Sequence, residues 1–222
     1  MVTDDTLKAR RATMVRDQLK RRGIADPEVL RVMGTVPRHA FMPEEDQAFA
    51  YVDGARPLSH GQTISQPYIV ALMTEALQPE PGLRVLEIGT GCGYQTAILA
   101  ELGLEIWSVE IVEPLARSAR EHLEALGYGD RFRLRVGDGR EGFKAGAPFD
   151  RLICAAAVPE IPETWRRQLV PGGWMVLPHG PSGRGAVQQL KCIRKPDTED
   201  GEWAETVILD VAFVPLTGEE GD

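Results

Sequence analysis

Apolar residues near the start of the chain recur at the spacing of an α-helix. Those that share one face of this helix are Leu7, Met14, Val15 and Leu19. Gly23 is where the helix is predicted to stop. The aspartate-proline pair at 26–27 is typical of a helix N-cap followed by proline in the first turn. The apolar residues of 68–77 predict a further helix, so the first part of the chain is predicted to be helical.

Beyond residue 81 the pattern changes to short apolar runs that alternate with helical stretches. The runs predicted to be strands are 84–88, 105–110, 132–136, 149–155 and 173–178. Helical stretches at 94–102 and 114–126 separate the first three of them. Strands that alternate with helices are typical of right-handed crossovers in a largely parallel sheet. This part of the chain therefore predicts a doubly wound α/β fold.

The last part of the chain has strands but no helix between them. Two strand-like runs, 186–194 and 206–215, are joined by a polar loop, which predicts an antiparallel hairpin at the edge of the sheet. At 222 residues the chain fits one domain, although its length alone also allows two small ones. We expect a single domain over 1–222, with a helical addition at 1–80 and the α/β core and hairpin over 81–222.

The balance of charges restricts the classes of partner. The chain has 33 acidic and 25 basic residues and a formal net charge of −8, whereas binding along a nucleic acid needs a surplus of lysine and arginine. The N-terminal segment is charged throughout, unlike a signal peptide, and no apolar run has membrane-spanning length. We therefore expect a cytoplasmic, soluble and monomeric protein with no nucleic-acid or membrane partner.

The cysteines and histidines show no spacing typical of a metal site. Cys92, Cys154 and Cys192 lie far apart in the chain, and the four histidines are scattered. We expect free thiols in a reducing compartment and no bound metal.

The first predicted strand of the α/β core runs directly into a glycine-rich turn. Gly89, Gly91 and Gly93 form a G-x-G-x-G pattern, in which the missing Cβ atoms let the backbone turn sharply and approach a ligand. The dinucleotide-binding pattern G-x-G-x-x-G needs glycine where this chain has Tyr94. Glu87, just before the loop, places a negative charge that disfavours a pyrophosphate but tolerates a cationic sulfonium or ammonium. Any one glycine, taken alone, is better explained by an ordinary turn.

Acidic residues follow the next two predicted strands. Glu110 ends the second strand, where a carboxylate can accept both hydroxyls of a ribose. Asp138 and Gly139 follow the third strand, where a side chain and an open backbone can meet an adenine edge. Alternatively, Glu110 is a charge at a helix N-terminus and Asp138 is part of a turn. The three strand ends together favour a nucleoside site, and Tyr94 and Glu87 favour S-adenosylmethionine over a dinucleotide.

Two segments that lie about twenty residues apart carry a resemblance to a known family. Gly-Gln-Thr-Ile-Ser-Gln-Pro-Tyr at 61–68, followed by Leu-Glu-Ile-Gly-Thr-Gly at 86–91, resembles the bacterial protein-L-isoaspartate O-methyltransferases. Further matching stretches are Val-Pro-Arg-His-Ala-Phe at 36–41, Gly-Asp-Gly at 137–139, Ala-Pro-Phe-Asp at 147–150 and Phe-Val-Pro-Leu at 213–216. The resemblance therefore extends from near residue 24 to near residue 218.

The resemblance implies a reaction and a set of residues. The implied reaction moves a methyl group from S-adenosylmethionine to the α-carboxylate of an L-isoaspartyl residue in a damaged protein or peptide, and the ester then closes to a succinimide. The matching positions imply that Ser65 is the active-site residue and that 1–80 includes the active-site segment. The residues implied to line the cofactor are Gln62, Thr63, Ile64, Glu87, Gly89, Gly91, Glu110, Asp138 and Gly139, with Thr217 at a matching position near it.

The implied reaction needs positioning more than acid–base chemistry. An ordinary carboxyl group has a pKa of about 4, so it is already ionised at neutral pH and needs no general base. Ser65 is therefore interpreted as a hydroxyl donor that orients the carboxylate, not as a nucleophile. The local sequence alone favours another role, because Ser-x-Pro before an apolar helical run is typical of a helix N-cap. Arg38 is a further hypothesis, as a cation for the substrate carboxylate.

Three alternatives stay open on the sequence. A methyltransferase dedicated to one aspartate of a modified peptide would use the same scaffold. An NAD-dependent oxidoreductase is disfavoured by Tyr94. A module that binds a nucleoside or damaged peptide without turnover is disfavoured by the presence of both Ser65 and the full glycine loop.

Overall fold

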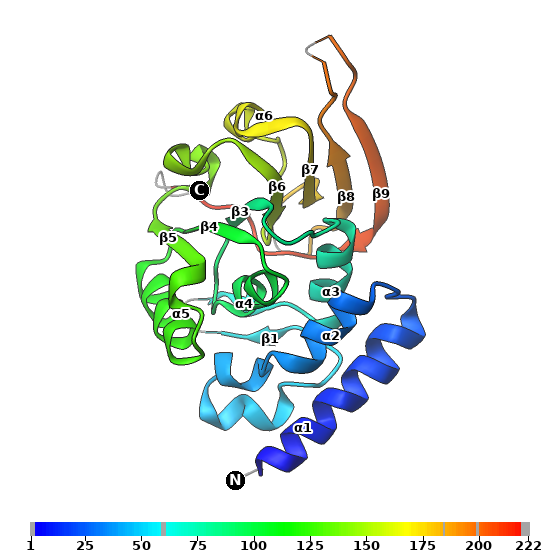
Figure 1. Ribbon diagram of the computed structural model, residues 1–222, viewed down its shortest axis with the longest axis vertical. Coiled ribbons are helices and arrows are strands. Elements are labelled where there is room, and N and C mark those ends of the chain that lie inside the picture. The colour runs from blue at the N-terminus through cyan, green and yellow to red at the C-terminus, as the bar shows by residue number, and fades with distance from the viewer. Residues whose placement is uncertain (1–2, 59–60, 184, 199, 219–222) are drawn as a thin grey trace.

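The centre of the molecule is a seven-stranded sheet with the order β5-β4-β3-β6-β7-β8-β9 (Figure 1). The computed structural model describes residues 3–58, 61–183, 185–198 and 200–218. The strands of the sheet are β3 (Arg84–Ile88), β4 (Glu105–Glu110), β5 (Phe132–Val136), β6 (Phe149–Cys154), β7 (Leu169–His179), β8 (Gln188–Arg194) and β9 (Ala204–Val211). The five strands from β5 to β7 are parallel, and β8 and β9 are antiparallel. The predicted parallel core and terminal hairpin are thus confirmed.

Successive residues of an inner strand point to opposite faces of the sheet, so each strand contributes to two hydrophobic layers. Val85 and Ile106 pack in one layer with the N-terminal helices, whereas Leu86 and Trp107 pack in the other with Trp165. The helices that follow strands of the sheet are α4 (Tyr94–Glu101), α5 (Glu113–Ala125) and α6 (Glu163–Gln168). Residues of α4 and α5 belong to the first layer and Trp165 of α6 to the second, as a doubly wound fold requires.

The N-terminal part packs as helices on the first of these layers. Its α-helices are α1 (Asp4–Thr13), α2 (Pro27–Thr35) and α3 (Pro67–Ala76). After α1 a π-helical stretch and a 3₁₀ turn continue to Arg22, and Gly23 ends them with a left-handed φ of +99°. Figure 1 shows α1 and α2 at the opposite end of the molecule from the far part of the β8–β9 hairpin. No helix within the described ranges is long and apolar enough to cross a membrane.

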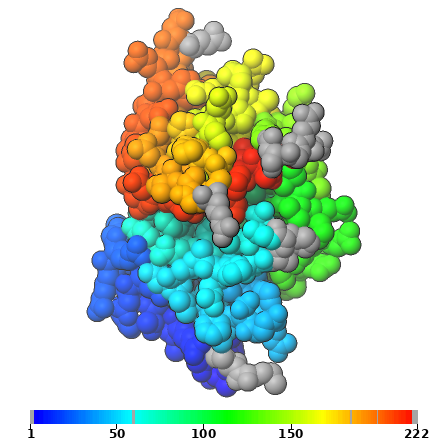
Figure 2. All heavy atoms as spheres, turned by 180° about the vertical axis from the view of Figure 1, so that it is seen from behind, coloured from blue at the N-terminus to red at the C-terminus, as the bar shows by residue number. Residues whose placement is uncertain are grey.

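A short two-stranded sheet, which the sequence did not predict, carries the segment before α3. Its strands are β1 (Arg56–Pro57) and β2 (Thr63–Ile64), paired antiparallel. The backbone N–H of Leu58 also donates to the carbonyl of Gln62 at 2.7 Å. In Figure 2 this segment and α3 (cyan) lie directly against the C-terminal strands (orange to red), in agreement with the pocket that Ile69 and Phe213 both line. The pairing holds Thr63 and Ile64 against β1, and Thr63 and Ser65 line a pocket together with residues at the ends of β3 and β4.

Four predicted strands have different bounds in the structure, and one α-helix was not predicted. β6 ends at Cys154 rather than at 155, and β8 begins at Gln188 rather than at 186. β7 begins at Leu169 rather than at 173, because Leu169 already pairs with Phe149 of β6 before an irregularity in the ladder, where Gly172 has a left-handed φ of +73°. β9 ends at Val211 rather than at 215, and Pro215 instead forms an isolated parallel bridge with Ala157. The six-residue helix α6 is too short to show a clear apolar period.

The cap of α2 gives a first prediction. Asp26 accepts hydrogen bonds from the backbone N–H groups of Glu28 and Val29 at 2.8 and 3.0 Å. Asp26→Ala leaves both donors without this acceptor, and we expect it to lower the free energy of unfolding by about 1 kcal/mol in urea titrations followed by circular dichroism. Asp26→Asn is the matched control, since an asparagine oxygen caps nearly as well. Equal losses in both variants would show that the cap is not what Asp26 contributes.

Candidate active site

Two adjoining pockets lie where β3 and β4 end and the segment before α3 crosses them. The first pocket has an empty volume of about 510 Å³ and the second of about 620 Å³. Thr63, Ser65, Gly89, Gly91 and Ala155 line both, so the pockets share a wall. Of the predicted site residues, Ile64 and Glu87 line only the first pocket, and Gln62, Glu110, Gly139 and Thr217 only the second. Asp138 alone lines neither.

The glycine loop has the backbone that its sequence predicts. Gly89, Gly91 and Gly93 have φ angles of +86°, +57° and +91°, a region that side chains disfavour. Gly93 also packs closely, because a Cβ there would meet Leu123 of α5 at 3.2 Å. Tyr94, at the position where a dinucleotide site needs glycine, is 2% exposed and makes an edge contact with Phe41. The loop is thus open toward the pockets and closed on its other side.

Glu87 lies beneath the loop in a buried polar network. It is 1% exposed, and one carboxylate oxygen, Oε2, accepts hydrogen bonds from Thr96 Oγ1 and Ser108 Oγ, both at 2.7 Å. Ser108 has a single hydroxyl proton, so Thr90 must donate in its own 2.6 Å contact with Ser108. The other oxygen of Glu87, Oε1, is buried without a partner within the described part of the chain.

The environment of Glu87 shifts its ionisation. Burial, opposed by the hydrogen bonds from Ser108 and Thr96, raises the pKa of Glu87 to about 7, and the negative charge of Glu110 acts in the same direction as burial. Near neutral pH the carboxyl is therefore divided between its two forms. A cation beside Oε1 would favour the charged form and supply the missing partner.

Glu110 ties the end of β4 to the glycine loop. Its carboxylate accepts from the backbone N–H of Gly91 at 2.8 Å and from that of Val112, the N-cap residue of α5, at 2.9 Å. The side chain is 5% exposed and lines the second pocket. Each oxygen keeps lone pairs for further donors, so this anchoring is compatible with the predicted contact to ribose hydroxyls.

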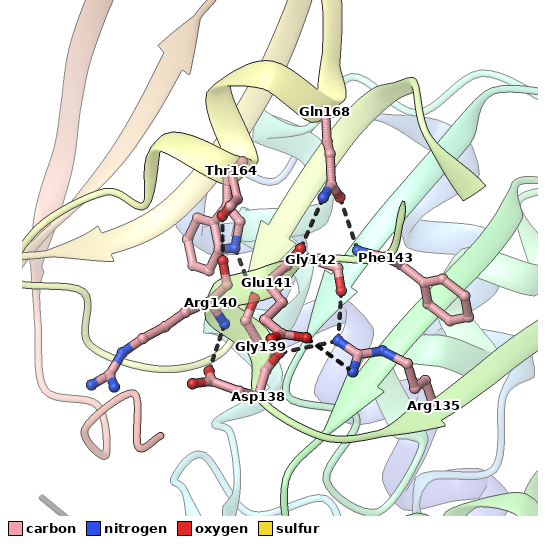
Figure 3. A network of polar contacts seen from close by, with 10 residues as sticks. Arg135, Asp138, Gly139, Arg140, Glu141, Gly142, Phe143, Thr164 and Gln168 are labelled. Atoms are coloured by element: carbon pink, nitrogen blue, oxygen red, sulfur yellow. Dashed lines mark hydrogen bonds and ion pairs between the residues drawn. The ribbon is translucent and has the colours of Figure 1, made fainter. Parts of the chain in front are cut away.

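The turn after β5 is held by side chains from outside it (Figure 3). Asp138 accepts from the backbone N–H of Arg140 at 2.8 Å and so begins a 3₁₀ turn, the local role that its sequence context allowed. Gly139 lines the second pocket, and its carbonyl accepts from Trp165 Nε1 at 2.8 Å. Arg135 Nη2 donates to the carbonyls of Asp138 and Gly142 at 3.1 and 2.8 Å. The backbone at Gly139 is therefore fixed beside the pocket.

The small size of Gly139 is required where it lies. A Cβ at this position would meet Cγ2 of Ile88, at the end of β3, at 2.6 Å. Gln168 of α6 braces the same turn, because its amide accepts from Phe143 N–H and donates to the carbonyl of Glu141, both at 2.8 Å.

Ser65 lies between β2 and α3 at the wall between the pockets. The N-cap residue of α3 is Gln66, without a side-chain cap, so the capping role that the local sequence favoured for Ser65 is wrong. Within the described residues the half-buried Ser65 hydroxyl has no hydrogen-bond partner. The Ser65 carbonyl accepts from Arg38 Nη2 at 2.8 Å. Ser65 thus presents a free hydroxyl on a fixed backbone.

The segment after β9 completes the second pocket. Ala157 N–H donates to the carbonyl of Val214 at 2.7 Å, and Leu216 N–H donates to the carbonyl of Ala157 at 3.0 Å. This exchange brings the chain back across the end of β6 and places Thr217 in the pocket wall. Residues about 130 positions after Gly89 in sequence thereby meet the glycine loop.

Several residues of the site were not identified from the sequence. Thr90, Thr96 and Ser108 form the network under Glu87, and Trp165 holds Gly139. The sequence signal that could have identified the network is a polar residue within an otherwise apolar strand or helix, such as Ser108 between Trp107 and Val109. Within the described residues, no three His, Cys, Asp or Glu side chains gather as a metal site, and all three cysteines are free and buried.

Comparison with known proteins agrees with this geometry. The family model described as protein-L-isoaspartate(D-aspartate) O-methyltransferase (PCMT) matches residues 9–221. A protein-L-isoaspartate O-methyltransferase of Methylorubrum populi is 53% identical over 208 residues, which cover 94% of this chain and 95% of the relative.

Two solved structures share the fold. A protein-L-isoaspartate O-methyltransferase has a TM-score of 0.83 at 27% identity, over 95% of this chain and 67% of that one. A Plasmodium falciparum protein assigned as the same enzyme, in complex with S-adenosyl-L-homocysteine, has a TM-score of 0.79 at 25% identity, over 93% of this chain and 98% of that one. The resemblance stated from the sequence is confirmed: the chain belongs to the protein-L-isoaspartate(D-aspartate) O-methyltransferase family.

Proposed function

We propose that this protein transfers a methyl group from S-adenosylmethionine to the α-carboxylate of L-isoaspartyl residues in damaged proteins and peptides. The observation that carries the proposal is the free hydroxyl of Ser65 at the shared wall of two pockets, one of which contains a buried carboxylate oxygen without a partner. Family membership supports the same reaction. The methyl ester then closes to a succinimide without further help from the protein.

The residues of both pockets fit S-adenosylmethionine. Oε1 of Glu87 is a buried acceptor that suits the ammonium of its methionine part. Glu110 in the second pocket suits the ribose hydroxyls, and the narrow wall at Gly139 suits a flat adenine ring. When bound, the cofactor supplies a methyl carbon carried on a positively charged sulfur.

The remaining cofactor residues are proposed by their positions. Gln62, Thr63 and Ile64 close the pockets from the side of β2, and Thr217 closes the second from the C-terminal segment. Asp138 acts next to the pocket, through the turn that it begins.

Ser65 is proposed to orient the acceptor. A carboxylate with an ordinary pKa of about 4 is ionised at neutral pH, so its oxygen can form the new bond to carbon without transfer of a proton. The Ser65 hydroxyl donates to one carboxylate oxygen and leaves the other aimed at the methyl carbon. Holding reacting groups in this way can contribute roughly 7–11 kcal/mol in favourable cases.

A third pocket offers a place for the peptide around the isoaspartyl residue. Thr63 and Ser65 line it together with Gln66 and Ile69 of the α3 region and residues 210–213 at the end of β9 and just after it. Because it shares Ser65 with the other two, a chain bound there would present its carboxylate to the same hydroxyl.

Further features of the protein are proposed from its charge and core. We infer that it acts in the cytoplasm as a monomer, without a nucleic-acid or membrane partner, supported by its net charge of −8 and its three free cysteines. One hydrophobic cluster contains residues from both 1–80 and 81–222, including Met33 and Leu99, which supports a single domain.

The reaction is tested with two synthetic peptides that differ only in isoaspartyl or aspartyl linkage at one position. We expect labelled methyl transfer from S-adenosylmethionine to the isoaspartyl peptide alone. Transfer to neither peptide, with cofactor binding intact by calorimetry, would exclude general repair and favour a dedicated substrate.

Ser65→Ala removes the proposed donor. The loss of a hydrogen bond to a charged group predicts a kcat lower by about 10- to 100-fold, with the affinity for S-adenosylhomocysteine unchanged. Ser65→Thr, which keeps a hydroxyl, is the matched control and should retain more turnover. Wild-type kcat in the alanine variant would contradict the assignment.

Glu87 predicts a pH dependence of cofactor binding. Its pKa of about 7 means that at pH 6 most molecules must release a proton before the carboxylate can pair with an ammonium, whereas at pH 8 most are already ionised. The Kd for S-adenosylhomocysteine should therefore fall about tenfold from pH 6 to pH 8. Glu87→Gln should bind more weakly and lose this dependence. An identical pH profile in both proteins would assign the effect to another group.

A further inference from the structure

Arg38 is the most deeply buried cation of the described structure, and it lies next to the active-site segment. It begins a 3₁₀ turn, Arg38–Phe41, and is 0% exposed. Its Nε donates to the carbonyl of Ala50 and its Nη2 to the carbonyl of Ser65, both at 2.8 Å. Its third nitrogen, Nη1, is buried without a partner within the described ranges. One side chain therefore joins the backbone at Ala50 to the backbone at Ser65.

The charge of Arg38 is not neutralised by the protein around it. Among the described residues it forms no ion pair with a carboxylate, and its guanidinium carbon lies 5.0 Å from the centre of the Tyr94 ring. A guanidinium stays protonated even when buried, and a buried charge without a counter-charge is unfavourable. Other buried cations in proteins are normally paired. If Arg38 were only a structural link, a neutral side chain in its place would cost less free energy to bury.

The proposed reaction supplies the missing counter-charge. We propose that Arg38 is the positioning residue of the site: it fixes the backbone of Ser65, and its positive charge favours an anionic substrate at the Ser65 hydroxyl. This rests on the proposed function. Arg38 lines none of the three pockets that Ser65 lines, and two of its nitrogens are used on carbonyls, so it acts through Ser65 rather than by contact with the carboxylate.

The alternative is a purely structural link between Ala50, Ser65 and the ring of Tyr94. Such a link would change the stability of the protein, but the folded molecules would keep their kcat and their KM for the peptide. The two roles are therefore distinguished by measuring kcat and KM on folded Arg38 variants, and by testing whether the effect of an Arg38 substitution depends on the Ser65 hydroxyl.

The experiment compares Arg38→Met, Arg38→Lys and the control Arg10→Lys. Arg10 also donates to a backbone carbonyl near this region, that of Ala48, but does not contact Ser65. We expect Arg38→Met to lower kcat/KM for the isoaspartyl peptide by about 10- to 100-fold, with the Kd for S-adenosylhomocysteine within about twofold of wild type. Arg38→Lys, which keeps the charge but not both hydrogen bonds, should lie between, and Arg10→Lys should match wild type.

A double-mutant cycle tests the route. Arg38→Met combined with Ser65→Ala should lose clearly less activity than the product of the two separate losses, since Arg38 is proposed to position that hydroxyl. Losses that multiply, or wild-type kcat and KM in folded Arg38→Met, would overturn the proposal. If Arg38→Met does not fold, Arg38→Lys takes its place in the cycle.

Hydrogen exchange gives a readout that does not depend on the reaction. Amides of residues 61–68 should exchange at least about tenfold faster in Arg38→Met than in Arg10→Lys. Equal exchange rates in the two variants would overturn the positioning role of Arg38, whatever the methylation assay shows. Failure of the wild-type protein to methylate either peptide would instead contradict the proposed function.

Discussion

Parallel pairing of β3 with β4 sets the position of the glycine loop and Glu110, around which both pockets form. The register that places Ile88 opposite Val109 brings the glycine loop and Glu110 to the same edge of the sheet. Glu110 can then accept from Gly91 N–H, which fixes the loop, and from Val112 N–H, which fixes the start of α5. One further parallel strand lies on each side of this pair. β5, next to β4, adds the turn at Gly139 to the same edge, and β6, next to β3, adds the pocket wall at Ala155. Ligand sites in open α/β sheets are built this way because the loops at the carboxyl ends converge.

The sequence correctly predicted those features that depend on the local pattern of residues and on the carboxyl edge of the parallel sheet. Short apolar runs predicted β3, β4 and β5 with their observed bounds, and the glycines predicted a backbone with positive φ. The capping role of Ser65 failed for a reason outside local pattern. β2 ends at Ile64 and the N-cap residue of α3 is Gln66, so Ser65 lies one residue before the N-cap, between the strand and the helix. Thr217 was found only through family resemblance, since the bridge of Pro215 to Ala157 joins segments far apart in the chain.

The network beneath the loop shows why the polar residues of the core were missed and why they matter. Ser108 and Thr96 are buried at positions where the pattern of the strand and helix calls only for apolar side chains. They offset part of the cost of burying Glu87, but only at one of its oxygens. A fully satisfied carboxylate would stabilise the ligand-free protein more and bind a cation less. The network therefore satisfies only one of the two oxygens, and Oε1 has no partner among the described residues.

Glu87 and Arg38 are two buried ionisable side chains of opposite charge type, and each has one polar atom without a partner among the described residues. Glu87 belongs to the α/β core, lines the first pocket, and has one carboxylate oxygen that is buried without a partner among the described residues. Arg38 belongs to the N-terminal addition and is a buried cation that donates to the Ser65 carbonyl and lies over the ring of Tyr94. The core alone has no residue in the Ser65 position, and the addition alone has no glycine loop. The two adjoining pockets are therefore complete only when both parts of the chain pack together.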